Sequence, residues 1–147
     1  MGQLTLPPVS SIYVDSSILI YTVETHARYW PSLQTLWEKA KSQTFTLITS
    51  ELTILECLVG PIKKGDQLLV QAYSQIFNSS DLNFVPIERR ILLTAAKLRA
   101  EIPALRTPDA LHAATAIESG CGAFLTNDTG FKKISGLEAI ILGESIG

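Results

Sequence analysis

IYVDSSILIY, the stretch from Ile12 to Tyr21, decides how this 147-residue sequence is interpreted. It begins as a β-rich apolar run, is interrupted by Asp15 and two serines, and then continues as an apolar segment that is predicted to be helical. A carboxylate that is buried without a partner costs free energy, so we expect Asp15 at a strand end. Two roles are open to it there: Asp15 caps the following helix, or it belongs to a functional site.

The composition indicates one globular domain that spans residues 1–147, with residues 1–10 as a loose N-terminal tail. Hydrophobic residues make up 46% of the chain and charged residues 18%, which argues against a disordered protein or a coiled coil. The net charge of −2 gives no general attraction to nucleic acid or to an anionic membrane. Because we find neither a membrane-spanning run nor a signal-peptide pattern, we expect a cytoplasmic protein.

Five short apolar runs alternate with helical patterns along the chain. The predicted strands are Ser11–Val14, Phe45–Thr49, Asn83–Ile87, Ala123–Thr126 and Glu138–Leu142. Four of them are continuously apolar, which is typical of a parallel sheet covered on both faces. The predicted helices are Ser16–Tyr21, Pro31–Ser42, Glu51–Val59, Lys63–Phe77, Glu88–Glu101 and Thr107–Ser119, with Gly60-Pro61 ending the third and Thr107 capping the sixth. This alternation predicts an α/β fold with right-handed crossovers.

Four acidic residues lie near the expected carboxyl ends of the strands, where open α/β sheets have their functional crevice. Asp15 follows the first strand and Asp128 follows the fourth. Asp109 begins the helix that leads into the fourth strand, and Glu56 lies in the helix after the second. Glu56 borders a stripe of apolar residues that we expect to face the core, formed by Leu52, Leu55, Leu58 and Val59.

Each of these acids also has an ordinary structural explanation: a helix cap for Asp15, a favourable helix dipole for Asp109, a turn for Asp128 and a solvated charge for Glu56. Their joint placement is more informative, because three of the chain's five aspartates fall where they can face one crevice. Clustered carboxylates repel one another unless a cation lies among them, and an all-oxygen site favours Mg²⁺ or Mn²⁺. Such an ion would also allow a chain of negative net charge to hold a phosphodiester.

Four blocks of the sequence resemble the PIN domain and, within it, the VapC-type toxins of bacterial toxin–antitoxin pairs. The blocks are VDSSILI (residues 14–20), SELTILEC (50–57), RTPDALHAATA (106–116) and FLTNDTGF (124–131). Each block alone is a weak signal, but the four in this order are specific. The resemblance extends over most of the chain, from Ile12 to Leu142.

The resemblance implies a three-layer α/β/α fold around a central parallel sheet, with a metal-dependent ribonuclease site. The acids of the family correspond here to Asp15, Glu56, Asp109 and Asp128, which would hold Mg²⁺ or Mn²⁺. The metal would activate a water molecule that attacks the RNA phosphodiester. The implied partners are the RNA substrate, a cognate antitoxin protein and a second copy of the chain in a homodimer.

Other polar residues are expected to support this site. Ser16 and Thr126 would hold the carboxylates, or a water molecule, by hydrogen bonds. His112 lies three residues after Asp109, on the same helix face, and would support the site or the core, whereas Asn127 would mainly shape the neighbouring turn. Three cations flank the predicted site and would contact RNA phosphates unless they are ordinary solvated charges: Arg106, Lys132 and Lys133.

Three alternatives to a toxin stay open. A haloacid-dehalogenase-like phosphatase also has an Asp after its first strand, but it usually needs a second Asp two residues later, where this chain has Ser17. A non-catalytic RNA- or protein-binding module on the same fold is disfavoured by the complete set of acids. An RNA-processing nuclease that is not a toxin would use the same residues, so the sequence does not separate these two functions.

Overall fold

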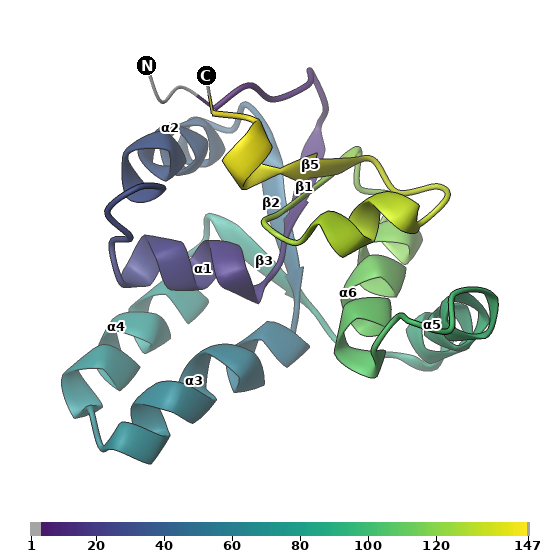
Figure 1. Cartoon of the computed structure of the whole chain (residues 1–147). Helices are drawn as coiled ribbons and strands as arrows, with labels where there is room; N and C mark the ends of the chain where they lie inside the picture. The colour runs from purple at the N-terminus through teal and green to yellow at the C-terminus, as the bar shows by residue number, and fades with distance from the viewer. Residues whose placement is uncertain (1–3, 147) are drawn as a thin grey trace.

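A parallel sheet lies between two layers of helices in the computed structural model, which describes residues 4–146 (Figure 1). The strands are β1 (Ser11–Val14), β2 (Thr46–Ser50), β3 (Leu82–Val85), β4 (Ala123–Thr126) and β5 (Ala139–Ile141). Their order in the sheet is β3-β2-β1-β4-β5, and all four pairings are parallel. The predicted α/β/α fold is therefore confirmed.

The helices agree with the predicted ones in number and order, with shifted ends. They are α1 (Ser16–Val23), α2 (Trp30–Lys41), α3 (Leu52–Lys64), α4 (Gln67–Phe77), α5 (Arg89–Glu101) and α6 (Thr107–Glu118). Two short 3₁₀ helices, η1 (Thr129–Lys133) and η2 (Leu142–Glu144), follow β4 and β5. Thr107, the predicted cap, is instead the first residue of α6, and its hydroxyl accepts a hydrogen bond from Arg99. None of the helices within residues 4–146 is long and apolar enough to span a bilayer.

Strand β1 contributes to the cores on both faces of the sheet, because successive side chains of a strand point to opposite sides. Ile12 and Val14 pack with side chains of α1, α2 and α4. Tyr13 lies in the core formed with α5 and α6, where its ring stacks on Phe124 of β4 at a centroid distance of 4.9 Å. A strand that is covered on both faces must be apolar throughout, which explains the uninterrupted apolar run that precedes Asp15.

Helix α3 is longer than the sequence suggests. It continues through Gly60-Pro61 to Lys64, although a proline inside a helix removes one backbone hydrogen bond. The ring of Pro61 is buried, so packing offsets this loss. The helix ends instead at Gly65, whose φ of +69° is the left-handed conformation that favours glycine, and α4 begins only at Gln67.

The buried face of α3 is also not the predicted one. Leu55 and Val59 were expected to face the core, but they are 60% and 55% exposed. The buried residues are Thr53, Cys57 and Pro61, which are spaced four apart on another face of the helix. These small side chains allow α3 to approach its neighbours closely: the hydroxyl of Thr53 bonds that of Thr49 in β2, and the thiol of Cys57 contacts the Ser16 carbonyl in α1. The larger apolar residues of α3 are therefore left at the surface.

The N-terminal segment is held against the C-terminal end of the chain. Leu4 is buried and pairs with Ile146 in an antiparallel bridge, and the amide of Thr5 donates to the Ser145 carbonyl. The expected loose tail is therefore wrong for the segment that begins at Leu4. Residues 1–3 of that expectation lie outside the described residues.

Candidate active site

The candidate site begins where the two central strands end. Val14 of β1 lies opposite Leu125 of β4, so the residues that follow, Asp15 and Thr126, are neighbours at the same edge of the sheet. The Thr126 hydroxyl donates to one carboxylate oxygen of Asp15, and the Ser17 hydroxyl donates to the other at 2.6 Å. Asp15 is 7% exposed, so it is a buried carboxylate that two hydroxyl groups fix in position.

Asp15 also caps helix α1, since its carboxylate accepts a hydrogen bond from the amide of Ile18 at 3.4 Å. Burial raises the pKa of the Asp15 carboxyl above its ordinary value, although the hydrogen bonds from the hydroxyl groups of Ser17 and Thr126 act in the opposite direction. A serine can cap a helix without burying a charge. Capping alone therefore does not explain why a carboxylate occupies this position.

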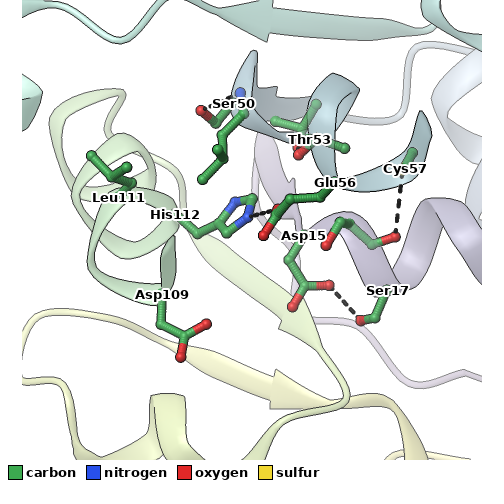
Figure 2. Close-up of polar contacts among 12 residues, drawn as sticks. Asp15, Ser17, Ser50, Thr53, Glu56, Cys57, Asp109, Leu111 and His112 are labelled. Carbon is green, nitrogen blue, oxygen red and sulfur yellow. Dashed lines mark hydrogen bonds and ion pairs between the residues drawn. The ribbon is translucent and has the colours of Figure 1, made fainter. Parts of the chain in front are cut away.

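A buried chain of hydrogen bonds supports Glu56. His112 of α6 is 3% exposed, and its Nε2 lies 2.6 Å from Glu56 Oε1. Figure 2 draws this contact as a dashed line. On the other side of the ring, Nδ1 lies 2.6 Å from the hydroxyl of Tyr13, which accepts a hydrogen bond from the amide of Ser50 at 3.1 Å. We assign the proton of the neutral ring to Nε2, because the Tyr13 hydroxyl then donates to Nδ1 and Nε2–H donates to Glu56.

The surroundings of Glu56 favour its charged form. Partial burial raises the pKa of this carboxyl, but the hydrogen bond with His112 lowers it, as do the Ser16 hydroxyl and the charge of Arg106. The net result is a pKa below the ordinary value. Glu56 is therefore an ionised carboxylate at neutral pH, and its orientation is fixed from inside the protein.

Asp109 and Asp128 complete the predicted set of acids from two other segments. Asp109 lies in the first turn of α6, with 20% of its side chain exposed, and forms an ion pair with Arg106 at 3.2 Å. Asp128 precedes η1 and accepts a hydrogen bond from the amide of Gly130 at 2.8 Å. The amide of Asp128 donates to the same Thr126 hydroxyl that holds Asp15, so both acids are anchored through one side chain.

The carboxylates of Asp15, Glu56 and Asp109 approach from the end of β1, from α3 and from α6, and Figure 2 shows them around His112. Oxygen donors of this kind suit Mg²⁺ or Mn²⁺, so the chemistry of the residues fits such an ion. Their positions are not those of a closed metal site: among residues 4–146, no three His, Cys, Asp or Glu side chains lie close enough to hold one ion. Asp109 forms its ion pair with Arg106 through one carboxylate oxygen, Oδ2, so a cation shared with the other acids would compete with Arg106 for this carboxylate.

The other predicted site residues divide into two groups. Ser16 forms a side-chain hydrogen bond with Glu56, and Lys133 lies in a cavity together with Asp109. Asn127 instead links Tyr21 to the backbone of Gly143, and Lys132 forms an ion pair with Glu144. The first group lies at the acids, whereas the contacts of the second group are with α1 and η2.

Two residues that hold the site were not expected from the sequence. Ser17 donates to Asp15, although Ser16 and Thr126 were the hydroxyl residues expected to hold the carboxylates. Tyr13 was treated as part of an apolar strand, yet its hydroxyl orients His112. The available signal was a single polar atom within a strand that is buried on both faces, because a buried hydroxyl group needs a partner.

Comparisons with known proteins agree with this architecture. The family model that matches the chain is that of the PIN domain, over residues 12–137. A solved structure of VapBC2 from Rickettsia felis, bound to a DNA fragment from its promoter, has a chain with a TM-score of 0.71 and 22% identity, and the match covers 89% of this chain and 98% of that one. A toxin–antitoxin complex from Klebsiella pneumoniae has a TM-score of 0.67 and 23% identity, covering 89% of this chain and 97% of that one.

A third similar structure is VapC20 from Mycobacterium tuberculosis, described as a toxin that cleaves the sarcin–ricin loop. It has a TM-score of 0.65 and 16% identity, and the match covers 86% of this chain and 98% of that one. A comparison with curated protein sequences finds no match. At these identities the solved structures establish a shared fold, whereas the family model assigns the sequence itself.

The buried hydrogen bonds that run from the Ser50 amide through Tyr13 and His112 to Glu56 predict that Tyr13→Phe destabilises the protein. The substitution leaves Nδ1 of His112 and the amide of Ser50 without a partner in a buried place, which costs about 1–3 kcal/mol in the free energy of unfolding. Tyr73→Phe is the matched control: that ring is equally buried, but its hydroxyl bonds Glu24, which is exposed and can bond water instead. Denaturant unfolding of the two variants measures the loss in the free energy of unfolding. Equal losses in the two variants would contradict the role of these buried hydrogen bonds.

The raised pKa of Asp15 predicts a pH-dependent loss of stability. The folded state binds the proton of Asp15 more tightly than the unfolded state, so this contribution is full below the ordinary pKa of Asp and is lost as the pH rises through the folded pKa. Asp15→Asn removes the penalty, so the variant should be more stable than the wild type at neutral pH, with a difference that disappears in acid. Thermal unfolding from acid to neutral pH measures the effect, with Asp81→Asn as a control. A stability difference between Asp15→Asn and the wild type that grows in acid would contradict the prediction.

Proposed function

The chain belongs to the PIN domain family, and on this premise we propose that it is a Mg²⁺- or Mn²⁺-dependent endoribonuclease and the toxin of a toxin–antitoxin pair. The observation that carries the proposal is the buried carboxylate of Asp15, which hydroxyl groups fix at the end of β1 with Glu56 and Asp109 nearby. Burying a charged carboxylate costs free energy of folding, and such groups are concentrated at functional sites. The similarity to VapC20, a toxin named for cleaving the sarcin–ricin loop, supports RNA as the substrate.

The residues of the site have separate tasks in this proposal. A bound divalent cation would supply an activated water and would stabilise negative charge at the phosphate. Asp15, Glu56 and Asp109 would hold it, with Asp128 beside them. Thr126 and Ser17 fix the direction of Asp15, and His112 fixes that of Glu56, so that neither carboxylate has to be ordered during the reaction.

Arg106 and Lys133 are suited to bind the RNA backbone. The side chain of Arg106 is 75% exposed, and its ion pair with Asp109 is formed through Nε, so the terminal nitrogens of the guanidinium are suited to bind a phosphate. Lys133 is exposed and lies in the same cavity as Asp109. Because the net charge of the chain is negative, these local cations and the metal together would provide the attraction for phosphate. Lys132, which is paired with Glu144, has a smaller role in this proposal.

A cognate antitoxin and a second copy of the chain are the proposed protein partners, and the cytoplasm, where RNA is accessible, is the proposed location. We propose that the antitoxin binds the exposed stripe of α3, formed by Leu55, Val59 and Ile62. These residues are 60%, 55% and 62% exposed and are spaced along one face of the helix, as an apolar docking surface requires. The similar structure from Klebsiella pneumoniae is a toxin–antitoxin complex, which supports a protein partner for this chain.

The proposed reaction predicts metal-dependent cleavage of RNA that requires Asp15. Wild-type protein incubated with ribosomal RNA should produce discrete fragments with Mg²⁺ or Mn²⁺ and none with a chelator, and Asp15→Asn should abolish them. Thr126→Val, which removes the hydroxyl that holds Asp15, should lower the rate by about 10–100-fold. Gel analysis of the fragments measures this.

Asp81→Asn is the control for this experiment, since Asp81 lies at the other end of the sheet, before β3. Cleavage that persists in Asp15→Asn would contradict the proposed site. Absence of cleavage with either metal, for ribosomal RNA and for a pool of single-stranded RNA, would instead favour a non-catalytic binding module.

The exposed stripe predicts that Leu55→Asp together with Val59→Asp abolishes the complex with the product of the reading frame immediately upstream. The fold should be unchanged, because both side chains are already in water. Leu92→Asp with Leu93→Asp, at two exposed positions of α5, is the matched control. Co-purification and light scattering measure the result: a retained complex would contradict the docking surface, and a dimer that becomes a monomer would assign the stripe to self-association instead.

A further inference from the structure

We propose that the cavity beside Asp109 and Asp128 binds one unpaired nucleobase of the RNA, next to the phosphate that is cleaved. This inference rests on the proposed function and adds to it a binding site for a particular part of the substrate. The cavity lies between the loop that joins α5 to α6 and the η1 turn after β4. It therefore opens at the same edge of the sheet as the candidate active site.

The floor of the cavity is apolar and rigid. Leu105 and Phe131 line it, and they are only 8% and 3% exposed. The ring of Phe131 packs against Phe124 of β4 at a centroid distance of 4.6 Å, and Phe124 in turn stacks on Tyr13. A preformed apolar floor of this kind, with few polar groups, is typical of sites for small aromatic groups.

The rim of the cavity decides which part of the RNA enters it. Two carboxylates, Asp109 and Asp128, line it together with two cations, Arg106 and Lys133. A phosphate on the floor of the cavity would lie against Leu105 and Phe131, which offer an anion neither charge nor a hydrogen bond. A neutral base avoids this cost and buries its ring on the floor, while the phosphates on either side of it can reach Arg106 and Lys133 at the rim.

The size of the cavity agrees with this occupant. Its volume is about 220 Å³, below the range of about 300–1,000 Å³ that is usual for drug-sized ligands, so it fits one ring system rather than a whole nucleotide. A base can enter such a cavity only when it is unstacked, as in loops and single strands of RNA. The cavity therefore favours substrates in which the nucleotide next to the cleaved bond is unpaired.

Ala104 provides a way to fill the cavity without disturbing the core, because it lines the cavity and is exposed. Ala104→Leu and Ala104→Phe add increasing volume to the cavity. Ala100→Phe is the matched control: Ala100 is also exposed, lies one turn earlier in the chain and does not line the cavity. Thermal unfolding of the three variants shows whether each is folded.

The binding experiment uses these substitutions in the Asp15→Asn background, in which no cleavage is expected. The probes are fluorescein-labelled oligomers of adenosine or uridine and an abasic ribose-phosphate oligomer of the same length, measured by fluorescence anisotropy at low salt. Base–protein stacking predicts that the oligomers with bases bind about tenfold more tightly than the abasic one. Ala104→Leu should reduce this preference, Ala104→Phe should abolish it, and Ala100→Phe should leave it unchanged.

Two results would overturn the inference. One is equal affinity for oligomers with and without bases, and the other is an unchanged preference in a folded Ala104→Phe variant. Binding is measured here without any reaction, so these results are distinct from a failure to cleave RNA, which would contradict the proposed function. A preference for bases that Ala104→Phe removes would support the cavity as a base site even in a protein that does not cleave the RNA supplied.

Discussion

One buried hydrogen-bonded chain connects the interior of the sheet to the candidate active site. It begins at the amide of Ser50, passes through the hydroxyl of Tyr13 and the ring of His112, and ends at the carboxylate of Glu56. It thereby connects β2, β1, α6 and α3. Buried polar groups are costly when unpaired, so each member of the chain restricts the position of the next. Glu56 owes its orientation to a strand residue that is fully buried.

Asp15 illustrates the conflict between stability and function at this site. Its burial raises the pKa of the carboxyl, which means that the folded protein holds the ionised form at a cost. Thr126 and Ser17 reduce that cost without removing it. A cation beside Asp15 would favour the charged form of the carboxyl. The free-energy cost of burying this carboxylate is then explained by its role in the proposed reaction. Arg106 supplies positive charge to Asp109 in a similar way, at the edge of the crevice.

Much of the architecture could be predicted from the sequence, because it depends on local patterns. The continuous apolar runs and the helices between them indicated a parallel sheet, and the strand ends indicated where the acids lie. The face of α3 was predicted wrongly, since a count of large apolar residues takes Leu55 and Val59 for core positions. Tertiary packing instead selected the small side chains of Thr53 and Cys57. The same limit applies to Tyr13 and His112, which are 99 positions apart in the sequence and meet only in the fold.

The central claim is that the acids of this crevice hold a divalent cation, and a crystal of the protein soaked in Mn²⁺ tests it most directly through anomalous diffraction. The account predicts an anomalous peak at about 2.0–2.3 Å from carboxylate oxygens of Asp15 and of Glu56 or Asp109. An absence of any peak at saturating Mn²⁺, or a peak bound only by residues outside the crevice, would contradict the claim.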